Sequence, residues 1–396
     1  MPDASRRRAR TGNVRDPPAR VTPLPGLARR GPDMSSQVIN FTRGVPAIES
    51  FPVEELIEAS AAVLREQAAA VLQYGPALGF LPMRQWLAEW QGVAVEQVLT
   101  GNGSLELVEF LCRTMIRPGD TVFTEAPTYD RTITLLRRHG ADVVGIRLED
   151  DGPSIEDLEA ALAKKVPKFF YVIPDFQNPS GAMCSGAKRR RIVELAEQHG
   201  FLIVEDAPYR LLRYRGVEEP TLFSLAPSRT LHMSSFTKLI APGVRMGFML
   251  GEPAILAKIA KVAEDTYISP GYVAHGIAWE WCRRGLLMPQ IERLKKLYAP
   301  RLEACLAAID RFMPDAVATR PDGGFFLSVT LPPGVSTTAV REAATKRQLN
   351  LADGLAFFPN GGGERFLRLP YCALTPAEIE DGIGRLAESV REVTKG

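Results

Sequence analysis

The feature that most constrains the fold is an alternation of two kinds of segment between residues 100 and 250. Short runs of β-branched and aromatic residues alternate with longer stretches of helical periodicity. This order predicts parallel strands joined by helices, and therefore an α/β large domain, residues 74–288, in which helices wrap a mostly parallel sheet. The predicted strands are Thr121–Glu125, Asp142–Leu148, Phe169–Ile173, Leu202–Glu205, Leu231–Ser234 and Met246–Leu250, and the predicted helices are Leu105–Ile116, Ile155–Ala163 and Ala187–His199.

The remaining folded sequence has a different pattern. A helical stretch runs from Pro289 to about Arg311 and is followed by a turn at Pro321–Gly324. We expect a smaller α+β domain over residues 289–396, with residues 35–73 associated with it. Its other predicted elements are strands Phe325–Leu331 and Phe366–Leu369 and helices Thr337–Arg347 and Pro376–Val393.

Charge and hydropathy exclude two classes of partner. The 396 residues carry a net charge of +2, but residues 1–34 hold eight arginines and three aspartates, so the rest of the chain carries −3. A mildly acidic body does not suit a phosphate backbone, and we interpret the basic run Lys188–Arg191 as a solvated helix face. No apolar run reaches the roughly 18 residues of a membrane-spanning helix. We therefore expect no nucleic-acid and no membrane partner.

The first 34 residues and the cysteines bear on the cellular setting. The N-terminal stretch is rich in arginine and proline, without apolar periodicity or the apolar core of a secretory signal, so we expect a disordered basic tail. Met34 is an alternative start. Five cysteines without a Cys-x-x-Cys pair favour reduced thiols in a cytoplasm and give no metal site.

A lysine flanked by hydroxyl groups follows the predicted strand Leu231–Ser234. It lies in Ser234-Ser235-Phe236-Thr237-Lys238, with Arg245 seven residues further on. An amine whose pKa is lowered by apolar and cationic surroundings can form a Schiff base with an aldehyde, whereas hydroxyls and an arginine suit a phosphate dianion. Taken alone, the same stretch also fits a surface turn.

A second motif, Val204-Glu205-Asp206-Ala207-Pro208-Tyr209, closes another predicted strand. Ligands bind beyond the carboxyl ends of strands in open α/β sheets. There Asp206 can pair with a protonated pyridine nitrogen, and Tyr209 can hydrogen-bond a phenolic oxygen. The alternative is that Asp206 caps the next helix.

Two turns and an aromatic residue complete the candidate site. The turn Pro174–Gly181 carries Asn178, and the glycine-containing stretch Thr100–Glu106 precedes a helix whose first N–H groups can face an anion. That stretch matches neither the dinucleotide-binding nor the P-loop pattern, which disfavours a nicotinamide enzyme and a P-loop NTPase. Tyr129 can stack on a flat ring, with a core position as the alternative.

Together and in this order, the motifs resemble the fold-type I pyridoxal-phosphate (PLP) enzymes, specifically the class I/II aminotransferases. The resemblance covers roughly residues 37–393 and is similar in detail to the 2-aminoadipate type. The stretches that carry it are Phe41–Ala47, Leu72–Pro76, Phe176–Gly181 and Phe357–Glu364 with Leu367–Leu369.

The resemblance implies a role for each candidate residue. Lys238 would bind the cofactor aldehyde and move the substrate proton, and Asp206 would keep the ring nitrogen protonated. The other implied cofactor contacts are Tyr209 and Asn178 at the ring hydroxyl, Tyr129 on the ring, and Gly103, Ser104, Leu105, Ser235, Thr237 and Arg245 at the phosphate. Arg368 would hold the substrate α-carboxylate, helped by Asn178 and Gly44. The resemblance also implies a homodimer in which Tyr74 reaches the other subunit's site.

The sequence departs from the relatives at two places. The Pro- and Arg-rich tail replaces a helical segment that helps to recognise the substrate's distal group in aminoadipate-type relatives. Arg43 stands where glycine is common, and it would either bind a second carboxylate or cap a turn.

Three functions are compatible with these residues. The first is transfer of an amino group from an L-amino acid to a 2-oxo acid such as 2-oxoglutarate or pyruvate. The second is a lyase or aminocyclopropane-carboxylate synthase reaction with the same cofactor. The third is an effector-sensing domain of a transcription regulator, although residues 1–34 are too short for the winged helix-turn-helix of such regulators.

Overall fold

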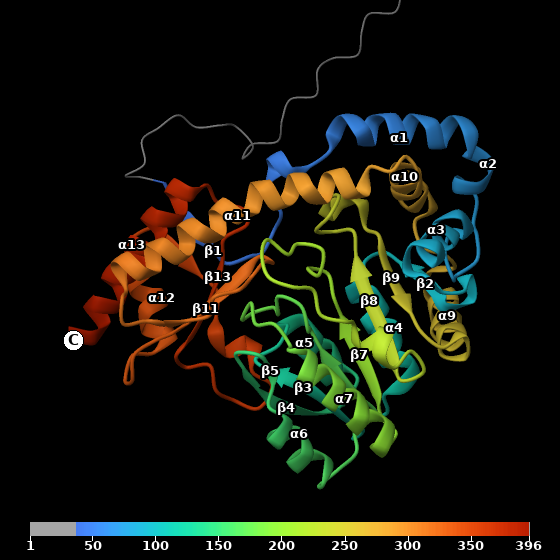
Figure 1. The fold of residues 1–396 in the computed structure, drawn as a ribbon. Coiled ribbons are helices and arrows are strands. Elements are labelled where there is room, and N and C mark those ends of the chain that lie inside the picture. Colours follow the sequence, from blue (N-terminus) through green and yellow to red (C-terminus); the bar gives the residue numbers. More distant parts are fainter. Residues whose placement is uncertain (1–36, 396) are drawn as a thin grey trace, which may run out of the picture. The chain divides into compact units, whose positions relative to one another are not determined.

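The computed structural model describes residues 37–395, so the tail predicted over residues 1–34 lies outside the described residues. The largest sheet in the described part has eight strands in the order β2-β9-β8-β7-β6-β3-β4-β5 (Figure 1). Strands β3, β4, β6, β7 and β8 are parallel, whereas β9 runs antiparallel to both of its neighbours. The mostly parallel sheet predicted from the sequence is therefore confirmed. The strands are β2 (Val98–Gly101), β3 (Thr121–Ala126), β4 (Asp142–Glu149), β5 (Gly152–Pro153), β6 (Phe169–Val172), β7 (Leu202–Asp206), β8 (Thr230–Ser235) and β9 (Gly247–Leu250).

Both faces of this sheet are covered by helices, which explains why its strands read as continuous apolar runs. Successive side chains of a strand point to opposite faces. In β6, Phe169 and Tyr171 pack in one apolar cluster with α4, α5 and α9, whereas Phe170 and Val172 pack in another with α6, α7 and α8. These helices are α4 (Ser104–Met115), α5 (Asp130–Arg138), α6 (Ile155–Leu162), α7 (Gly186–His199), α8 (Leu222–Leu225) and α9 (Pro253–Tyr267).

Caps set the limits of the predicted helices. The Ser154 side chain accepts a hydrogen bond from the backbone at the start of α6, and Ser185 does the same for α7. Gly200 ends α7 in the left-handed conformation, which glycine adopts without steric cost. The helices predicted in the first half of the chain accordingly lie within one or two residues of the observed ones.

The C-terminal part combines helices with a small sheet. Strands β10 (Val317–Ala318), β11 (Phe326–Thr330) and β13 (Phe366–Pro370) form an antiparallel sheet, and α11 (Leu287–Phe312), α12 (Thr337–Lys346) and α13 (Pro376–Lys395) pack with it (Figure 1). The long helix α11 belongs to two apolar clusters. Its first half packs in a cluster with β9 and with the segments that follow β7 and β8, and its second half packs in a cluster with α13.

The N-terminal segment contacts both parts of the chain. Strand β1 (Ile39–Phe41) pairs in parallel with β12 (Leu349–Leu351), beside α13. Helix α1 (Val53–Glu66) instead packs against α10 (Tyr272–Arg283), and α2 (Ala68–Val71) and α3 (Leu81–Gln91) follow it. Whether residues 35–73 count with the small domain stays a prediction.

The structure corrects one interpretation of the basic run Lys188–Arg191. The side chain of Arg189 is fully buried and forms an ion pair with the equally buried Asp175, at 2.9 Å between Nη2 and Oδ1. Arg189 precedes the buried Ile192, Val193 and Ala196 by three, four and seven positions, so it lies on the inner face of α7. The run is therefore not wholly a solvated face.

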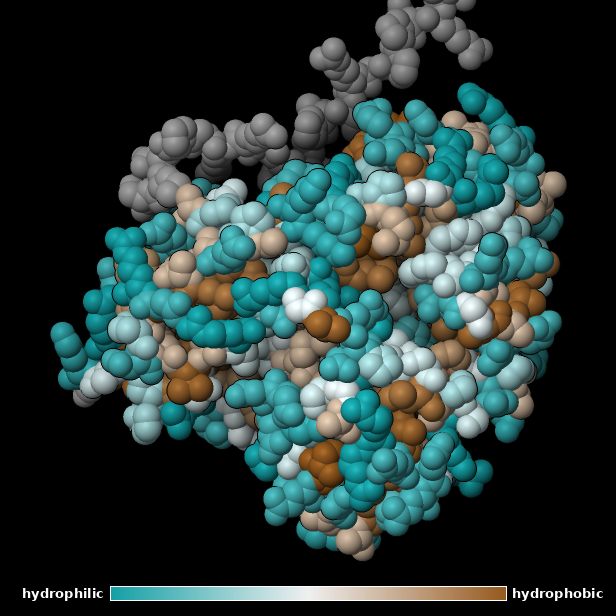
Figure 2. All heavy atoms as spheres, viewed as in Figure 1, coloured by the Kyte–Doolittle hydropathy of each residue, from teal (hydrophilic) through white to brown (hydrophobic). Residues whose placement is uncertain are grey.

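The surface in Figure 2 is mainly hydrophilic, with hydrophobic residues in separate small groups. Within the described residues, the structure has no helix that is long and apolar enough to cross a membrane.

Candidate active site

A cavity of about 550 Å³ lies beyond the carboxyl ends of the central strands, where they meet β11, β13 and the segment Thr42–Val45. Its walls bring together side chains that are far apart in the sequence. The predicted site residues that line it are Arg43, Gly44, Gly103, Ser104, Leu105, Tyr129, Asn178, Asp206, Tyr209, Ser235, Thr237, Lys238, Arg245 and Arg368.

Asp206 is the last residue of β7 and is 6% exposed. Its Oδ2 accepts a hydrogen bond from the hydroxyl of Tyr171 at 2.6 Å, whereas its buried Oδ1 has no hydrogen-bond partner among the described residues. Burial raises the pKa of Asp206 to about 6, although the Tyr171 hydrogen bond opposes this shift. No helix begins at Asp206, so the helix-cap alternative is wrong. The free oxygen is suited to a cationic N–H donor in the cavity.

Lys238 follows β8 and points into the same cavity. Its Nζ donates to the carbonyl oxygen of Gly44 at 2.7 Å and lies 5.8 Å from the ring centroid of Tyr209. Burial lowers the pKa of Lys238 to about 8, and the guanidinium of Arg368 acts in the same direction. About a tenth of the amine is therefore neutral, and nucleophilic, at pH 7, far more than for a lysine of ordinary pKa.

An anion site is built from two close backbone approaches. Gly103 has φ +99°, and a side-chain carbon there would lie 2.5 Å from Nη2 of Arg245. A side-chain carbon at Gly247 would lie 2.5 Å from the backbone nitrogen of Ser104, the first residue of α4. The hydroxyls of Ser235 and Thr237 are 2.7 Å apart at the same place. A helix N-terminus, hydroxyls and a guanidinium form a cradle for a phosphate group.

Arg368 lies on β13 and lines the same cavity. Its guanidinium carbon lies 5.0 Å from the ring centroid of Phe326 and 4.6 Å from that of Phe357, which hold its plane. Nη1 donates to Oδ1 of Asn178 at 3.0 Å and Nη2 to the carbonyl of Thr42 at 2.6 Å. Its Nε is buried without a partner among the described residues. A planar cation held in this way is suited to a carboxylate.

The remaining aromatic and amide groups line the same cavity. Tyr209 is buried and contacts Phe325 and Phe326, each at 5.6 Å between ring centroids. Tyr129 is partly buried at the start of α5, and Asn178 is 6% exposed. A flat ring with a phosphate at one end therefore has side chains of suitable chemistry along the whole cavity.

Sequence reasoning missed two buried groups beside the site. One is Tyr171, whose hydroxyl in an otherwise apolar strand was the available signal. The other is Glu125, which accepts hydrogen bonds from Nε2 of Gln177 at 3.0 Å and from the backbone of Ile173 at 3.1 Å. Burial raises the pKa of Glu125 to about 8. Glu125 thus supports the turn that carries Asn178.

Two predicted residues lie differently from the rest. Tyr74 is 73% exposed and does not line the cavity. Arg43 lines the cavity but is exposed at its edge. The contact of Tyr74 with a second subunit and the binding of a second carboxylate by Arg43 therefore stay predictions.

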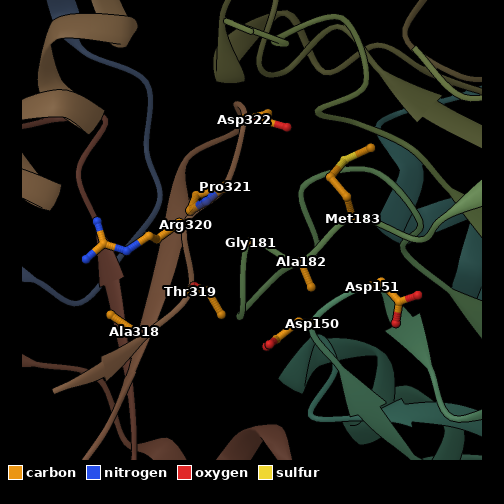
Figure 3. A pocket seen from close by; sticks show the side chains of 10 residues that line it. All are labelled: Asp150, Asp151, Gly181, Ala182, Met183, Ala318, Thr319, Arg320, Pro321 and Asp322. Carbon is orange, nitrogen blue, oxygen red and sulfur yellow. The ribbon is translucent and has the colours of Figure 1, made fainter. Parts of the chain in front are cut away.

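A second cavity, of about 440 Å³, lies behind the turn that carries Asn178. Gly181–Met183 form one wall and Ala318–Asp322 the other, with Asp150 and Asp151 at the edge (Figure 3). Thr319 links the walls, because its hydroxyl donates to the carbonyl of Ser180 at 2.6 Å.

A lysine of lowered pKa, a buried carboxylate with a free oxygen and a phosphate cradle in one cavity define a PLP-dependent enzyme of fold type I. The comparisons with solved structures agree. The α-aminoadipate aminotransferase of Thermus thermophilus, solved with N-(5'-phosphopyridoxyl)-L-leucine, has a TM-score of 0.87 and 32% identity over 90% of this chain and 93% of its own. The kynurenine aminotransferase of Pyrococcus horikoshii has a TM-score of 0.88 and 32% identity over 90% and 92%.

The family model for aminotransferase class I and II matches residues 36–386. The aromatic-amino-acid aminotransferase 1 of Thermococcus litoralis is 36% identical over 375 residues, which are 91% of this chain and 90% of the relative. The 2-aminoadipate transaminase of Thermus thermophilus is 33% identical, over 89% of this chain and 90% of the relative. The chain belongs to the class I and II aminotransferases, and it is a PLP-dependent aminotransferase.

Proposed function

We propose that the protein transfers the amino group of an L-amino acid to a 2-oxo acid, with 2-oxoglutarate or pyruvate as acceptor. Lys238 would bind the cofactor aldehyde and move the substrate proton. The observation that supports this most directly is that one cavity contains both Lys238, whose pKa is about 8, and the buried Asp206, which keeps one oxygen without a hydrogen-bond partner among the described residues. When bound, pyridoxal 5'-phosphate supplies an aldehyde and a ring that accepts negative charge from the substrate Cα.

The chain's own residues would hold this cofactor by its two ends and its ring. The free Oδ1 of Asp206 would accept a hydrogen bond from the ring nitrogen and keep it protonated, which the buried anion favours. Tyr209 and Asn178 would contact the ring hydroxyl, and Tyr129 would stack on the ring. The phosphate would be held by Gly103, Ser104, Leu105, Ser235, Thr237 and Arg245.

Substrate binding would begin at Arg368. The guanidinium is fixed between two aromatic rings and has an unpartnered Nε, so a carboxylate can bind it without moving the side chain far. Asn178 and the backbone of Gly44 would complete the contact. With the carboxylate fixed, Nζ of Lys238 would take the proton from the substrate Cα and deliver it to C4′, the cofactor carbon that carries the aldehyde.

Arg43 would bind the distal carboxylate of an acidic substrate at the edge of the cavity. Its exposure there allows a second carboxylate to approach it. Arg43→Ala should then raise KM for acidic amino acids and leave KM for neutral ones unchanged. An equal effect on both would contradict this role.

A homodimer is supported by exposed apolar residues in the stretch from α1 to α3. Ile57, Leu64, Leu72, Tyr74 and Leu81 are each at least 46% exposed. A second copy of the chain would cover them and would bring Tyr74 to the phosphate cradle of its partner. Sedimentation of the wild type and of Leu64→Glu measures this directly, because a charge in the contact should shift the dimer to monomer.

The setting and the domain division are proposed on simpler grounds. The five cysteines are buried free thiols, which suits a reducing compartment such as the cytoplasm. We propose a large domain over residues 74–288 and a small domain over residues 289–396, with which the N-terminal segment 35–73 is associated.

The experiment that tests the function is a single half-reaction. Adding an amino acid to the enzyme loaded with PLP should convert its visible absorbance to that of pyridoxamine phosphate, and adding an oxo acid should reverse the change. Lys238→Ala should lack both the starting absorbance and the conversion. A lyase would release products without accumulating pyridoxamine phosphate.

A further inference from the structure

Asp175 is a buried carboxylate that the reaction described above does not use. It is fully buried at the start of the segment 174–184, which we call the Asn178 loop because it carries that residue into the cavity. An isolated buried carboxylate is unfavourable, so its partners indicate what it does.

Three arginines surround Asp175. Arg189 contacts both carboxylate oxygens, at 2.9 and 3.4 Å, and Arg210 contacts both at 3.3 and 3.2 Å. The third, Arg213, lies 3.9 Å away with its guanidinium 4.9 Å from the ring centroid of Phe176. Asp175 is thus the shared anion of a cationic cluster drawn from α7 and from the segment after β7.

Arg189 fixes the two ends of the Asn178 loop. Its Nη2 donates to the carbonyl of Pro174 and its Nε to the carbonyl of Cys184, both at 2.9 Å. The backbone of Cys184 donates to the same carbonyl of Pro174 at 2.9 Å. Because the guanidinium also holds Asp175, the loop is closed at its base by one buried side chain.

Arg210 connects that loop to Tyr209. Arg210 directly follows Tyr209 in the sequence. Its Nη1 contacts Asp175, and its Nη2 donates to the carbonyl of Glu219 at 2.7 Å. The position of Tyr209 relative to Asn178 therefore depends on an ion pair outside the cavity.

The loop needs this support for two reasons. Phe176 has φ +52°, a left-handed conformation that is unfavourable for a residue other than glycine. Behind the loop, Gly181–Met183 border the 440 Å³ cavity, so the loop is packed incompletely on that side, where Gly181 and Ala182 are buried and Thr319 donates to the carbonyl of Ser180 (Figure 3).

We propose that Asp175 is a positioning residue, which through Arg189 and Arg210 fixes Asn178 and Tyr209 relative to each other. The proposal rests on the proposed function, in which both side chains contact the ring hydroxyl of the cofactor. Two donors on one oxygen stabilise its anionic form, so their joint placement sets the proton affinity of the lysine-linked cofactor. The charged or titratable groups that act on Lys238 itself are Cys372 and Arg368, and neither is changed in the test.

The test compares three variants of the PLP-loaded enzyme. Asp175→Asn removes the anion. Arg210→Met removes the contact of Arg210 with Asp175, together with its ion pair to the exposed Glu218 and its hydrogen bond to the carbonyl of Glu219, while the buried Arg189 keeps its partner. Glu280→Gln is the matched control, because Glu280 is a carboxylate of 2% side-chain exposure with two arginine partners, Arg283 and Arg284, and it does not line the cavity. Visible absorbance is titrated with pH, and kcat and KM are measured for each variant.

We expect Asp175→Asn and Arg210→Met to raise the pH midpoint of the absorbance change by about half a unit or more. We also expect kcat to fall about fivefold or more, because a misplaced contact weakens orientation. Glu280→Gln should lower thermal stability and leave both quantities unchanged.

An unchanged midpoint and kcat in Arg210→Met would overturn the proposal, and this variant decides the matter if Asp175→Asn does not fold. Equal midpoint shifts in the Glu280→Gln control would overturn it as well. Absence of any visible band in the wild type would instead refute the proposed role of Lys238.

Discussion

The Nζ atom of Lys238 donates to the carbonyl oxygen of Gly44, which lies 194 positions earlier in the chain, at 2.7 Å. The neighbouring carbonyl of Thr42 accepts from Arg368 at 2.6 Å. One extended segment therefore contacts both the lysine and the guanidinium that the reaction needs. Because the contacts come from backbone atoms, the segment can hold these groups only if it approaches them closely.

Gly44 permits that approach, and Gly44→Ala should disturb it. A side-chain carbon at this position would lie 2.2 Å from Cζ of Phe326, so either the segment or the ring must move. Since Phe326 also lies against Arg368, we expect kcat/KM to fall by about tenfold or more. Gly384→Ala is the control, because its nearest contact would be an ordinary 3.9 Å. Steady-state kinetics of both variants measure the difference, and equal values would show that Gly44 is not required.

The pKa of Lys238 predicts how fast the apoprotein takes up PLP. Only the neutral amine attacks an aldehyde, and burial lowers the pKa of this amine to about 8. The rate of uptake should rise about tenfold per pH unit below 8 and level off above it. The growth of visible absorbance after mixing measures this rate. A rate that keeps rising to pH 10 would indicate an amine of ordinary pKa.

The large sheet could be predicted because its strands are buried on both faces, so each appears as an apolar run bounded by turns. Strand β2 (Val98–Gly101) contains only two apolar residues, Val98 and Leu99, before Thr100 and Gly101, so it does not appear as an apolar run. The pairing of β1 with β12 joins residues about 310 positions apart, Ile39 with Leu349, and no local pattern indicates it.

The site residues that could be predicted follow strand ends, where local motifs are readable. Tyr171 and Glu125 were missed because their importance comes from contacts with residues distant in the sequence. Tyr171 donates to Asp206 on the neighbouring strand, and Glu125 accepts from Gln177 in the Asn178 loop. Arg189 had a readable signal in its spacing to Ile192, Val193 and Ala196, but a run of four basic residues suggests solvent exposure. The run of charges and the position of Arg189 on the apolar face of the helix gave opposite predictions, and the position on the helix gave the correct one.

Tyr171→Phe should impair the enzyme in a pH-dependent way. The Tyr171 hydroxyl lowers the pKa of Asp206 against the effect of burial, so without it the pKa should rise further above 6. Fewer carboxylates are then ionised at pH 7, and we expect kcat and PLP affinity to fall about threefold to tenfold. The defect should shrink as the pH rises towards 9, because the carboxylate ionises again.

A matched control for this variant is Tyr267→Phe. The Tyr267 hydroxyl is buried without a hydrogen-bond partner among the described residues, so its removal should leave activity unchanged at every pH. A pH-independent loss in Tyr171→Phe would point to packing instead of Asp206.

Glu125→Gln should make the protein more stable at alkaline pH. Burial raises the pKa of Glu125 to about 8, above the value of about 4.3 expected for the unfolded chain. The folded state then binds the proton more tightly, so this group's contribution to stability is present below pH 4 and is lost as the pH rises from about 4 to 8. Glutamine has no charge to bury and should remove a penalty on the order of a few kcal/mol at pH 8.5.

Urea unfolding at pH 5 and pH 8.5 checks this prediction, since the variant's advantage should appear only at the higher pH. Glu280→Gln should behave oppositely. Although burial opposes it, hydrogen bonds from Arg284 and Arg283 lower the pKa of Glu280, so that variant should lose stability at both pH values.

Arg368→Lys should separate charge from geometry at the α-carboxylate. The guanidinium lies between Phe326 and Phe357 and already donates to Asn178 and Thr42, so its plane and its free Nε are fixed before substrate arrives. An ammonium keeps the charge but cannot offer two parallel donors, and it loses the stacking on both rings. We expect KM for the amino acid to rise about tenfold or more, with a smaller change in kcat. Single-turnover titration with one amino acid at increasing concentration measures the affinity directly, and an unchanged affinity would mean that the carboxylate binds elsewhere in the cavity.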